Sequence, residues 1–301
     1  MYLRRKIDDY LKEWKNSEER KPLIIKGARQ IGKTESIRKF AEENYTSVIE
    51  INFVEEPKYR TIIVDGYGAD EIVKSISRID PQKQFIPKET LIFFDELQEF
   101  PEIATSLKFF AQDGRFDIIC SGSLLGISYQ RIESNSVGYK NDYTMYSMDF
   151  EEFLWAKGYQ DDVIEDMLEH MCQGKAFGKA ELYTFEEAFL DYCILGGLPA
   201  VVREYISTNT FTGTLQMQTQ LLEDYKEDIR KYADGLDQTR ILNVFQHIPV
   251  QLAKDNKKFP KIESGKRSKV QRLSRVYRMA EGYGTCKCML LSAISGIAIK
   301  R

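Results

Sequence analysis

Short apolar runs alternate with longer amphipathic stretches in the first half of the chain. Runs rich in apolar and β-branched residues predict buried strands at 22–26, 47–53, 91–94 and 116–120. Stretches with apolar residues at helical spacing predict helices at 35–41, 68–79 and 102–114. Strands that alternate with helices in this way indicate an α/β fold with a parallel sheet.

Two further patterns flank this core. Residues 2–15 place apolar side chains at helical spacing with charges between them, which predicts an amphipathic helix packed beside the first strand. Arg4 and Arg5, near the start of that helix, are expected to be solvated. Residues 139–148 are expected to add another strand.

The pattern is helical from Phe150 onward. It predicts helices at 149–157, 160–173, 184–194, 199–206, 214–233 and 238–254. The segment Gly196-Gly197-Leu198-Pro199 is expected to end one helix and begin the next, because proline suits the first helical turn. Charged side chains on the 214–233 helix are expected to form a solvated face.

The composition is that of an ordinary soluble protein. In 301 residues, a hydrophobic content of 43% supports a sizeable core, and a formal net charge of −3 gives no overall bias toward nucleic acid or membrane surfaces. No apolar run approaches the ~20 residues of a membrane span, and the charged start of the chain does not resemble a signal peptide. We therefore expect a cytoplasmic protein without a membrane partner.

The cysteines and histidines offer little metal or redox chemistry. The five cysteines are scattered and lack C-x-x-C spacing, which disfavours a disulfide framework or a zinc site. Such cysteine usage is typical of a reducing compartment. His170 and His247 are expected to be ordinary helix-face residues.

A phosphate-binding motif lies between the first predicted strand and the first helix that follows it. The motif G-x-x-x-x-G-K-[ST] is matched by Gly27, Ala28, Arg29, Gln30, Ile31, Gly32, Lys33 and Thr34. In such a loop the glycines allow a tight turn whose N–H groups face the phosphates, and the helix N-terminus adds positive potential. Lys33 is predicted to reach the β- and γ-phosphates of ATP, and Thr34 is predicted to place its hydroxyl on Mg²⁺.

The second decisive stretch is the apolar run 91–94, which ends in Asp95 and Glu96. Asp95 is predicted to lie at the carboxyl end of a buried parallel strand, where ligands bind in open α/β sheets. There it can hold Mg²⁺, directly or through water. Glu96, one residue beyond, is the candidate that polarises the attacking water.

A third candidate group follows the strand at 116–120. Ser121 and Ser123 stand at its end, where a hydroxyl can hydrogen-bond the γ-phosphate or the water. The alternative is a serine turn that is needed only for its geometry. Arg131, farther along, is a weaker candidate for an arginine that reaches a neighbouring active site.

These motifs together resemble those of a known family. The segments 27–34, 93–98 (Phe-Phe-Asp-Glu-Leu-Gln) and 121–123 look like those of bacterial and archaeal AAA-type P-loop ATPases that carry a C-terminal domain of unknown function. Met148 to Leu154 and the Gly196–Pro199 turn are similar to later family segments. The resemblance covers about residues 1–270.

The resemblance implies a three-layer α/β/α P-loop core, with the strand before Ser121 lying between the P-loop strand and the Asp95 strand. A mostly helical extension with a winged-helix-like segment is implied to follow. The predicted boundaries are an N-terminal helix in 1–20, the ATPase core in 21–149, the helical extension in 150–235, a basic winged-helix-like segment in 236–278 and an atypical tail in 279–301. Family members run on past this length, and helical patterning is lost near residue 278, so a truncated or frameshifted C-terminus is our hypothesis for the tail.

A local excess of Lys and Arg between Lys254 and Arg278 departs from the weakly acidic background. One interpretation is a DNA-contacting surface, and the alternatives are a solvated surface or one that pairs with a missing C-terminal region. The preferred function is hydrolysis of ATP with Mg²⁺ as a molecular switch, in a protein that can oligomerise. A nucleotide-dependent DNA-binding module with little turnover is the alternative, and a defective remnant is a third.

Overall fold

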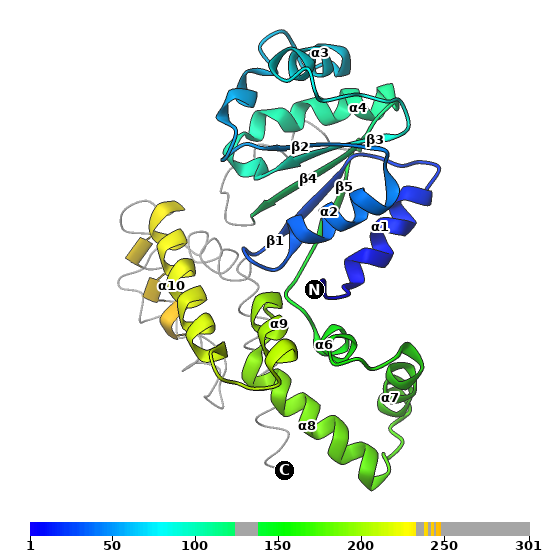
Figure 1. Ribbon diagram of the computed structural model, residues 1–301, viewed down its shortest axis with the longest axis vertical. Coiled ribbons are helices and arrows are strands. Elements are labelled where there is room, and N and C mark those ends of the chain that lie inside the picture. The colour runs from blue at the N-terminus through cyan, green and yellow to red at the C-terminus, as the bar shows by residue number, and fades with distance from the viewer. Residues whose placement is uncertain (124–137, 233–237, 240–241, 244, 248–301) are drawn as a thin grey trace, which may run out of the picture. The chain divides into compact units, whose positions relative to one another are not determined.

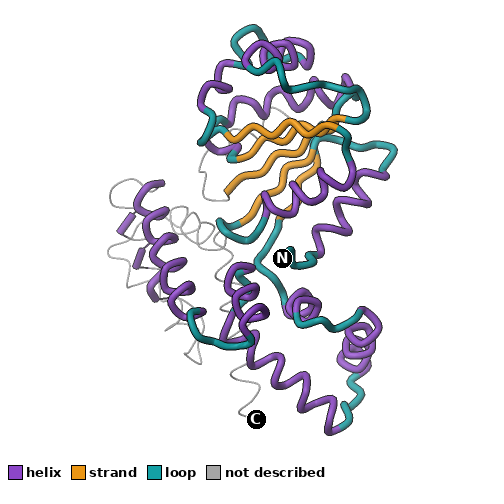
Figure 2. Tube along the Cα trace, in the orientation of Figure 1, coloured by secondary structure: helices purple, strands orange, loops and turns teal. Residues whose placement is uncertain are grey.

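A computed structural model describes residues 1–123, 138–232, 238–239, 242–243 and 245–247. The chain divides into two compact units. One comprises Lys6–Met145, and the other combines Met1–Arg5 with the chain from Tyr146 onward. Within the described residues, all strands belong to the first unit and the second unit is helical (Figure 2).

The first unit contains a five-stranded parallel sheet in the order β2-β3-β4-β1-β5. The strands are β1 (Leu23–Gly27), β2 (Ser47–Asn52), β3 (Thr90–Asp95), β4 (Asp117–Ser123) and β5 (Asn141–Thr144). Strand β4 lies between β1 and β3, so the order implied by the resemblance is confirmed. The strand expected within 139–148 is present in shorter form as β5.

Helices cover both faces of this sheet (Figure 1). They are α1 (Lys6–Asn16), α2 (Lys33–Asn44), α3 (Ala69–Ile79) and α4 (Leu107–Asp113), with short 3₁₀ turns η1 (Pro57–Thr61), η2 (Leu97–Glu99) and η3 (Pro101–Ser106). Ile92 and Phe94 of β3 share one apolar cluster with residues of α3 and α4. Since side chains alternate along a strand, Leu91 and Phe93 face the opposite layer, where α1 and α2 lie. The predicted three-layer core is confirmed.

Two predicted helices of this unit differ in detail. The helix expected at 102–114 is a 3₁₀ turn followed by α4. Pro101 opens that turn, and the Ser106 hydroxyl donates to the Ile103 carbonyl oxygen at 2.6 Å, an i−3 contact that suits 3₁₀ geometry. Helix α1 begins at Lys6 rather than at residue 2, because Leu3 packs in the apolar cluster of the second unit.

The second unit is built from five helices in the range 150–232. They are α6 (Phe150–Ala156), α7 (Asp161–Gln173), α8 (Lys179–Leu195), α9 (Pro199–Thr208) and α10 (Thr214–Tyr232). Its main cluster joins Phe153 of α6, Tyr192 of α8, Val202 of α9 and Leu221 of α10. Helix α8 begins five residues before the predicted start at 184, where the Glu181 carboxylate accepts the Gly178 N–H at 2.9 Å.

The Gly196–Pro199 turn ends α8 and begins α9, as predicted. Gly196 has φ 68°, which glycine adopts without strain, and Pro199 occupies the first turn. A Cβ on Gly197 would lie 2.0 Å from the Met148 carbonyl oxygen, and the Gly197 carbonyl oxygen accepts the Met148 N–H at 2.7 Å. Only glycine permits this close approach of two backbones.

The expectation that Arg4 and Arg5 are solvated is wrong for Arg5. Its side chain is buried, its Nε lies 3.0 Å from a Glu152 carboxylate oxygen, and its Nη2 donates to the Tyr146 carbonyl oxygen at 2.7 Å. Glu152 also accepts the Asp149 N–H, and the Asp149 side chain accepts the Glu152 N–H, which completes a capping box at α6. The buried ion pair therefore fixes the first residues of the chain to the helical unit.

The remaining predictions fall mostly outside the described residues. Residues 238–239, 242–243 and 245–247 are helical, within the helix predicted at 238–254. The basic segment Lys254–Arg278, the tail 279–301 and Arg131 lie outside the described residues.

Candidate functional site

The phosphate-loop motif connects the end of β1 to the start of α2. Gln30 (φ 61°) and Gly32 (φ 89°) adopt left-handed backbone conformations that turn the chain into the helix. A Cβ on Gly27 would lie 2.5 Å from the Met145 carbonyl oxygen and from the Ile31 side chain. Gly27 is therefore required by the close approach of the chain after β5. The loop has the strand–loop–helix context that the motif needs.

Lys33, at the start of α2, turns its ammonium toward the loop. Its Nζ donates to the carbonyl oxygens of Gly27 at 3.2 Å and Ala28 at 2.6 Å. Burial lowers the pKa of Lys33 to about 8, although the carboxylates of Glu96 and Asp95 act in the opposite direction. The ammonium is thus a poorly solvated cation directly beneath the loop, which favours anionic ligands.

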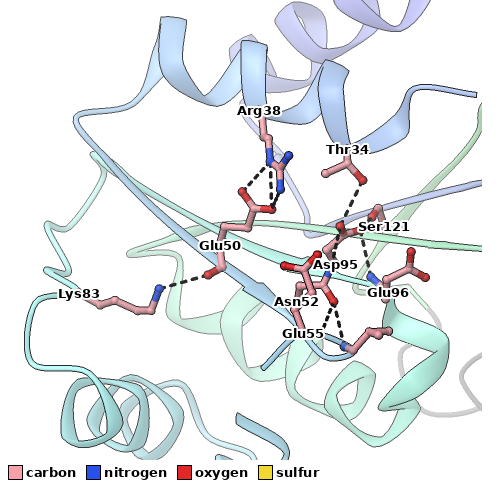
Figure 3. Close-up of polar contacts among 10 residues, drawn as sticks. Thr34, Arg38, Glu50, Asn52, Glu55, Lys83, Asp95, Glu96 and Ser121 are labelled. Atoms are coloured by element: carbon pink, nitrogen blue, oxygen red, sulfur yellow. Dashed lines mark hydrogen bonds and ion pairs between the residues drawn. The ribbon is translucent and has the colours of Figure 1, made fainter. Parts of the chain in front are cut away.

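Asp95 stands at the end of β3 and faces the first turn of α2. Its side chain is 4% exposed. The Thr34 hydroxyl donates to one carboxylate oxygen at 3.2 Å, the Ser121 hydroxyl donates to the other, and the Glu96 N–H donates to that same oxygen at 3.0 Å (Figure 3). Burial raises the pKa of Asp95 despite these hydrogen bonds. The structure thus brings the predicted metal-ligand pair, Thr34 and Asp95, within hydrogen-bond distance.

Asn52, at the end of β2, also belongs to this group. Its Nδ2 donates to Asp95 at 3.4 Å, and its Oδ1 accepts the backbone N–H groups of Val54 and Glu55 at 2.9 and 3.1 Å (Figure 3). Asn52 therefore joins the carboxylate to the turn after β2. Asn52 follows an alternating strand, and nothing in that pattern distinguishes it from an ordinary strand end.

Glu96 follows Asp95 in a left-handed backbone conformation, with φ 55° and ψ 48°. A non-glycine residue in this region is uncommon, and it is found at functional sites more often than elsewhere. The Glu96 carboxylate accepts a hydrogen bond from the Gln98 side-chain amide. The Gln98 oxygen accepts the Ser123 N–H at 3.0 Å. Ser123, at the end of β4, is thereby connected to Glu96 through one side chain.

The two serines predicted to hydrogen-bond the γ-phosphate or the water, Ser121 and Ser123, have different surroundings. Ser121 is fully buried and its hydroxyl is engaged by Asp95. Ser123 is 2% exposed and uses its backbone N–H toward Gln98. Both serines converge on the carboxylates after β3. Arg29 lies in the loop near Lys33, where its charge opposes that of the ammonium.

Two family models match the chain. Residues 19–154 match one described as an AAA domain, and residues 186–281 match one described as a domain of unknown function. The match to the first spans both the loop and the carboxylates. Over residues 19–154 the chain is thus similar to AAA domains, and this region is called the AAA domain below. This domain carries the P-loop fold, and the second match accounts for the C-terminal domain of unknown function that the resemblance implies.

Solved structures give more distant similarity. Drosophila ORC bound to DNA is 14% identical, with 96% of this chain and 84% of that chain covered at a TM-score of 0.39. AMPPCP-bound DnaA from Aquifex aeolicus is 17% identical, with 95% and 90% covered at 0.33. C. elegans PCH-2 is 10% identical, with 58% of this chain and 49% of that chain covered at 0.31, so the chain spans about half the PCH-2 length. A comparison with curated proteins finds no match.

The donor set of the AAA domain fits a hard divalent cation. Mg²⁺ prefers oxygen ligands and is commonly held by one or two carboxylates together with waters and substrate phosphates. Thr34 and Asp95 supply a hydroxyl and a carboxylate in one place. Among the residues that the structure describes, no cluster of three or more His, Cys, Asp or Glu side chains is placed to hold a metal ion. In the same residues, no helix is long and apolar enough to cross a membrane.

Proposed function

We propose that the AAA domain binds ATP with Mg²⁺ and hydrolyses it as a molecular switch. The observation that carries this proposal is the meeting of Thr34 of the phosphate loop with Asp95 at 3.2 Å. Residues 61 positions apart in sequence contact each other only because β1 and β3 end at the same edge of the sheet. A loop hydroxyl beside a buried carboxylate is the arrangement that a phosphate-bound cation requires.

Each residue then has a distinct role. The loop 27–34 wraps the phosphates with its N–H groups, and Lys33 offsets their charge. Thr34 and Asp95 are the residues that would hold Mg²⁺, which would supply Lewis-acid stabilisation of charge on the phosphate oxygens. Ser121 orients the Asp95 carboxylate.

Glu96 is the group that would accept the proton of the attacking water, and Ser123, at the end of β4, is the candidate that would hydrogen-bond the γ-phosphate. Positioning and electrostatics account for most of the catalysis of phosphoryl transfer, so the placement of these groups is expected to supply most of the rate enhancement. Switches of this kind await a trigger, so the basal turnover is expected to be slow.

The test compares the wild-type protein with Glu96→Gln. Phosphate release from ATP·Mg²⁺ should fall by at least about 100-fold in the variant, since a general base contributes roughly 10²- to 10⁴-fold. Binding of a fluorescent ATP analogue should persist, because the loop and Lys33 are unchanged. Equal turnover by the two proteins would show that Glu96 is not the general base. No turnover by either protein would contradict the proposal that the protein hydrolyses ATP.

A further inference from the structure

Gln98 is a buried polar residue without a role in the mechanism above. It lies in the 3₁₀ turn η2, directly after the two carboxylates of β3, and only 9% of it is exposed. A buried side-chain amide needs partners for both its oxygen and its nitrogen. The partners here are the Ser123 N–H on β4 and the Glu96 carboxylate.

The chemistry of these partners fixes the orientation of the amide. A backbone N–H can only donate, so the Gln98 oxygen must face Ser123. The Gln98 nitrogen then necessarily faces Glu96, whose ionised carboxylate can only accept. Exchange of the two amide ends would oppose donor to donor and acceptor to acceptor. The connection therefore has one stable arrangement.

We propose that Gln98 is a positioning residue that holds the Glu96 carboxylate for attack by water and connects it to the end of β4. This inference rests on the proposed ATP hydrolysis at the same site. One carboxylate oxygen of Glu96 is held by Gln98, which leaves the second oxygen for the water. Because the same amide is bonded to the Ser123 N–H, a shift of the β4 end is passed to Glu96 through two hydrogen bonds.

The Glu96 side chain needs a hydrogen-bond partner to hold it because its backbone conformation alone does not fix its rotamer. It follows the strand in a left-handed conformation and caps a turn of three residues. A glutamate side chain has several rotatable bonds, and a partly exposed one samples many rotamers. A small misplacement of a reacting group lowers the rate strongly even when ligand binding is intact. Gln98 restricts the rotamers of Glu96 by a hydrogen bond to its carboxylate, the group that would react.

Two substitutions separate the two hydrogen bonds. Gln98→Met has similar length and loses both partners. Gln98→Glu retains an acceptor for the Ser123 N–H but opposes Glu96 with a like charge. Glu99→Gln is the matched control, since Glu99 stands next in the same turn and lies 3.8 Å from Arg60 instead.

Steady-state and single-turnover ATP hydrolysis should show kcat lowered by roughly 10- to 100-fold in both Gln98 variants. KM and the Kd for a fluorescent ATP analogue should stay within about twofold of wild type. In a Glu96→Gln background the Gln98 substitutions should cause no further loss, because the group they position is already absent. Glu99→Gln should hydrolyse ATP at the wild-type rate.

Several outcomes would overturn the inference. A rise in KM or Kd with kcat unchanged would assign Gln98 to the shape of the site rather than to Glu96. A faster kcat would show that Gln98 withholds Glu96 from the water. If Gln98→Met fails to fold in a thermal melt, a wild-type rate in Gln98→Glu would show that the hydrogen bond from Gln98 to Glu96 does not position the carboxylate. These results are distinct from a failure of ATP hydrolysis, in which wild type itself releases no phosphate and Glu96→Gln changes nothing.

Discussion

In the part of the chain that the structure describes, each unit buries one carboxylate, and the two carboxylates differ in their partners. Asp95 and Glu152 are each 4% exposed. In the described part of the chain, the donors to Asp95 are neutral groups: the hydroxyls of Thr34 and Ser121, the Asn52 amide and a backbone N–H. Glu152 lies 3.0 Å from the guanidinium of Arg5. The groups that hydrogen-bond Asp95 are therefore neutral, whereas Glu152 faces the full opposite charge of Arg5.

We interpret this difference as one between a proposed metal-binding group, Asp95, and a structural group, Glu152. Burial of a carboxylate is costly unless its charge is compensated. Arg5 compensates Glu152 permanently, and the pair holds the chain start and the first turn of α6 together. Asp95 has a raised pKa because its partners compensate burial incompletely. That is the state expected of a carboxylate whose full counter-charge is a bound cation.

The strongest test of this comparison is Asp95→Asn. The amide keeps the shape of the side chain and removes the charge that would hold Mg²⁺. We expect ATP turnover to fall by at least about 100-fold, the usual loss when a group that stabilises transition-state charge is removed. The free energy of unfolding in urea should not decrease, since a poorly compensated buried charge is lost. A variant that is both active and less stable would make Asp95 a structural residue like Glu152.

The opposite result is expected for Glu152→Gln. This change leaves the buried Arg5 without its counter-charge, and breaking one side of a buried pair typically costs about 3 kcal/mol of stability. The unfolding transition of the helical unit should therefore shift to lower urea, while ATP turnover of the folded protein stays within about twofold. Glu151→Gln, one residue earlier in the same turn, should change stability by less than about 0.5 kcal/mol. A loss of turnover without a loss of stability would reverse the assignment.

The smallest effect is expected at Asp142 of β5, where a carboxylate is paired but half exposed. Burial opposes its ionisation, yet hydrogen bonds and charges of Lys140 and Lys26 outweigh burial and lower the pKa of Asp142. A lowered pKa adds stability above the unfolded value of about 4, and this stability is lost as the pH falls through the folded pKa. Since solvent screens the pair, we expect Asp142→Asn to lose only about 0.5 kcal/mol at pH 7.

The pH dependence provides the measurement for this third substitution. Thermal melts of wild type and Asp142→Asn should differ at pH 7 and converge as the pH falls below the lowered pKa of Asp142, where the carboxyl is neutral in both folded and unfolded chains. A gap that is constant with pH would mean that shape, rather than charge, sets the contribution of Asp142.

The residue patterns predicted the fold of the α/β unit, Lys6–Met145, well because each of its motifs consists of consecutive residues. The loop 27–34 and the run ending in Asp95 each carry their own signal, and the parallel sheet brings them together without further information. The roles of Gln98 and Asn52 could not be predicted from the sequence. Their side chains act across strands, so their partners depend on the strand order and register.

In the second, helical unit, the sequence predicted the local elements but not the contacts between distant residues. Helix spacing located α6 to α10 to within a few residues, since amphipathic periodicity is local. The pair of Arg5 and Glu152 joins positions far apart in sequence, and a basic residue near a chain start is most often solvated. The capping box of Asp149 and Glu152 was the one local sign that Glu152 has a structural role.

The pKa of about 8 at Lys33 would make the proposed binding of ATP a proton-linked equilibrium. Near that pH a share of the molecules carries a neutral amine, and an arriving triphosphate favours the charged form and so takes up a proton from the buffer. The heat of binding in calorimetry will then vary with the ionisation enthalpy of the buffer, and the affinity will decline as the pH rises above about 8. The neutral amine of Lys33 would thus accept a proton when ATP binds, and the affinity of the loop for ATP would depend on pH.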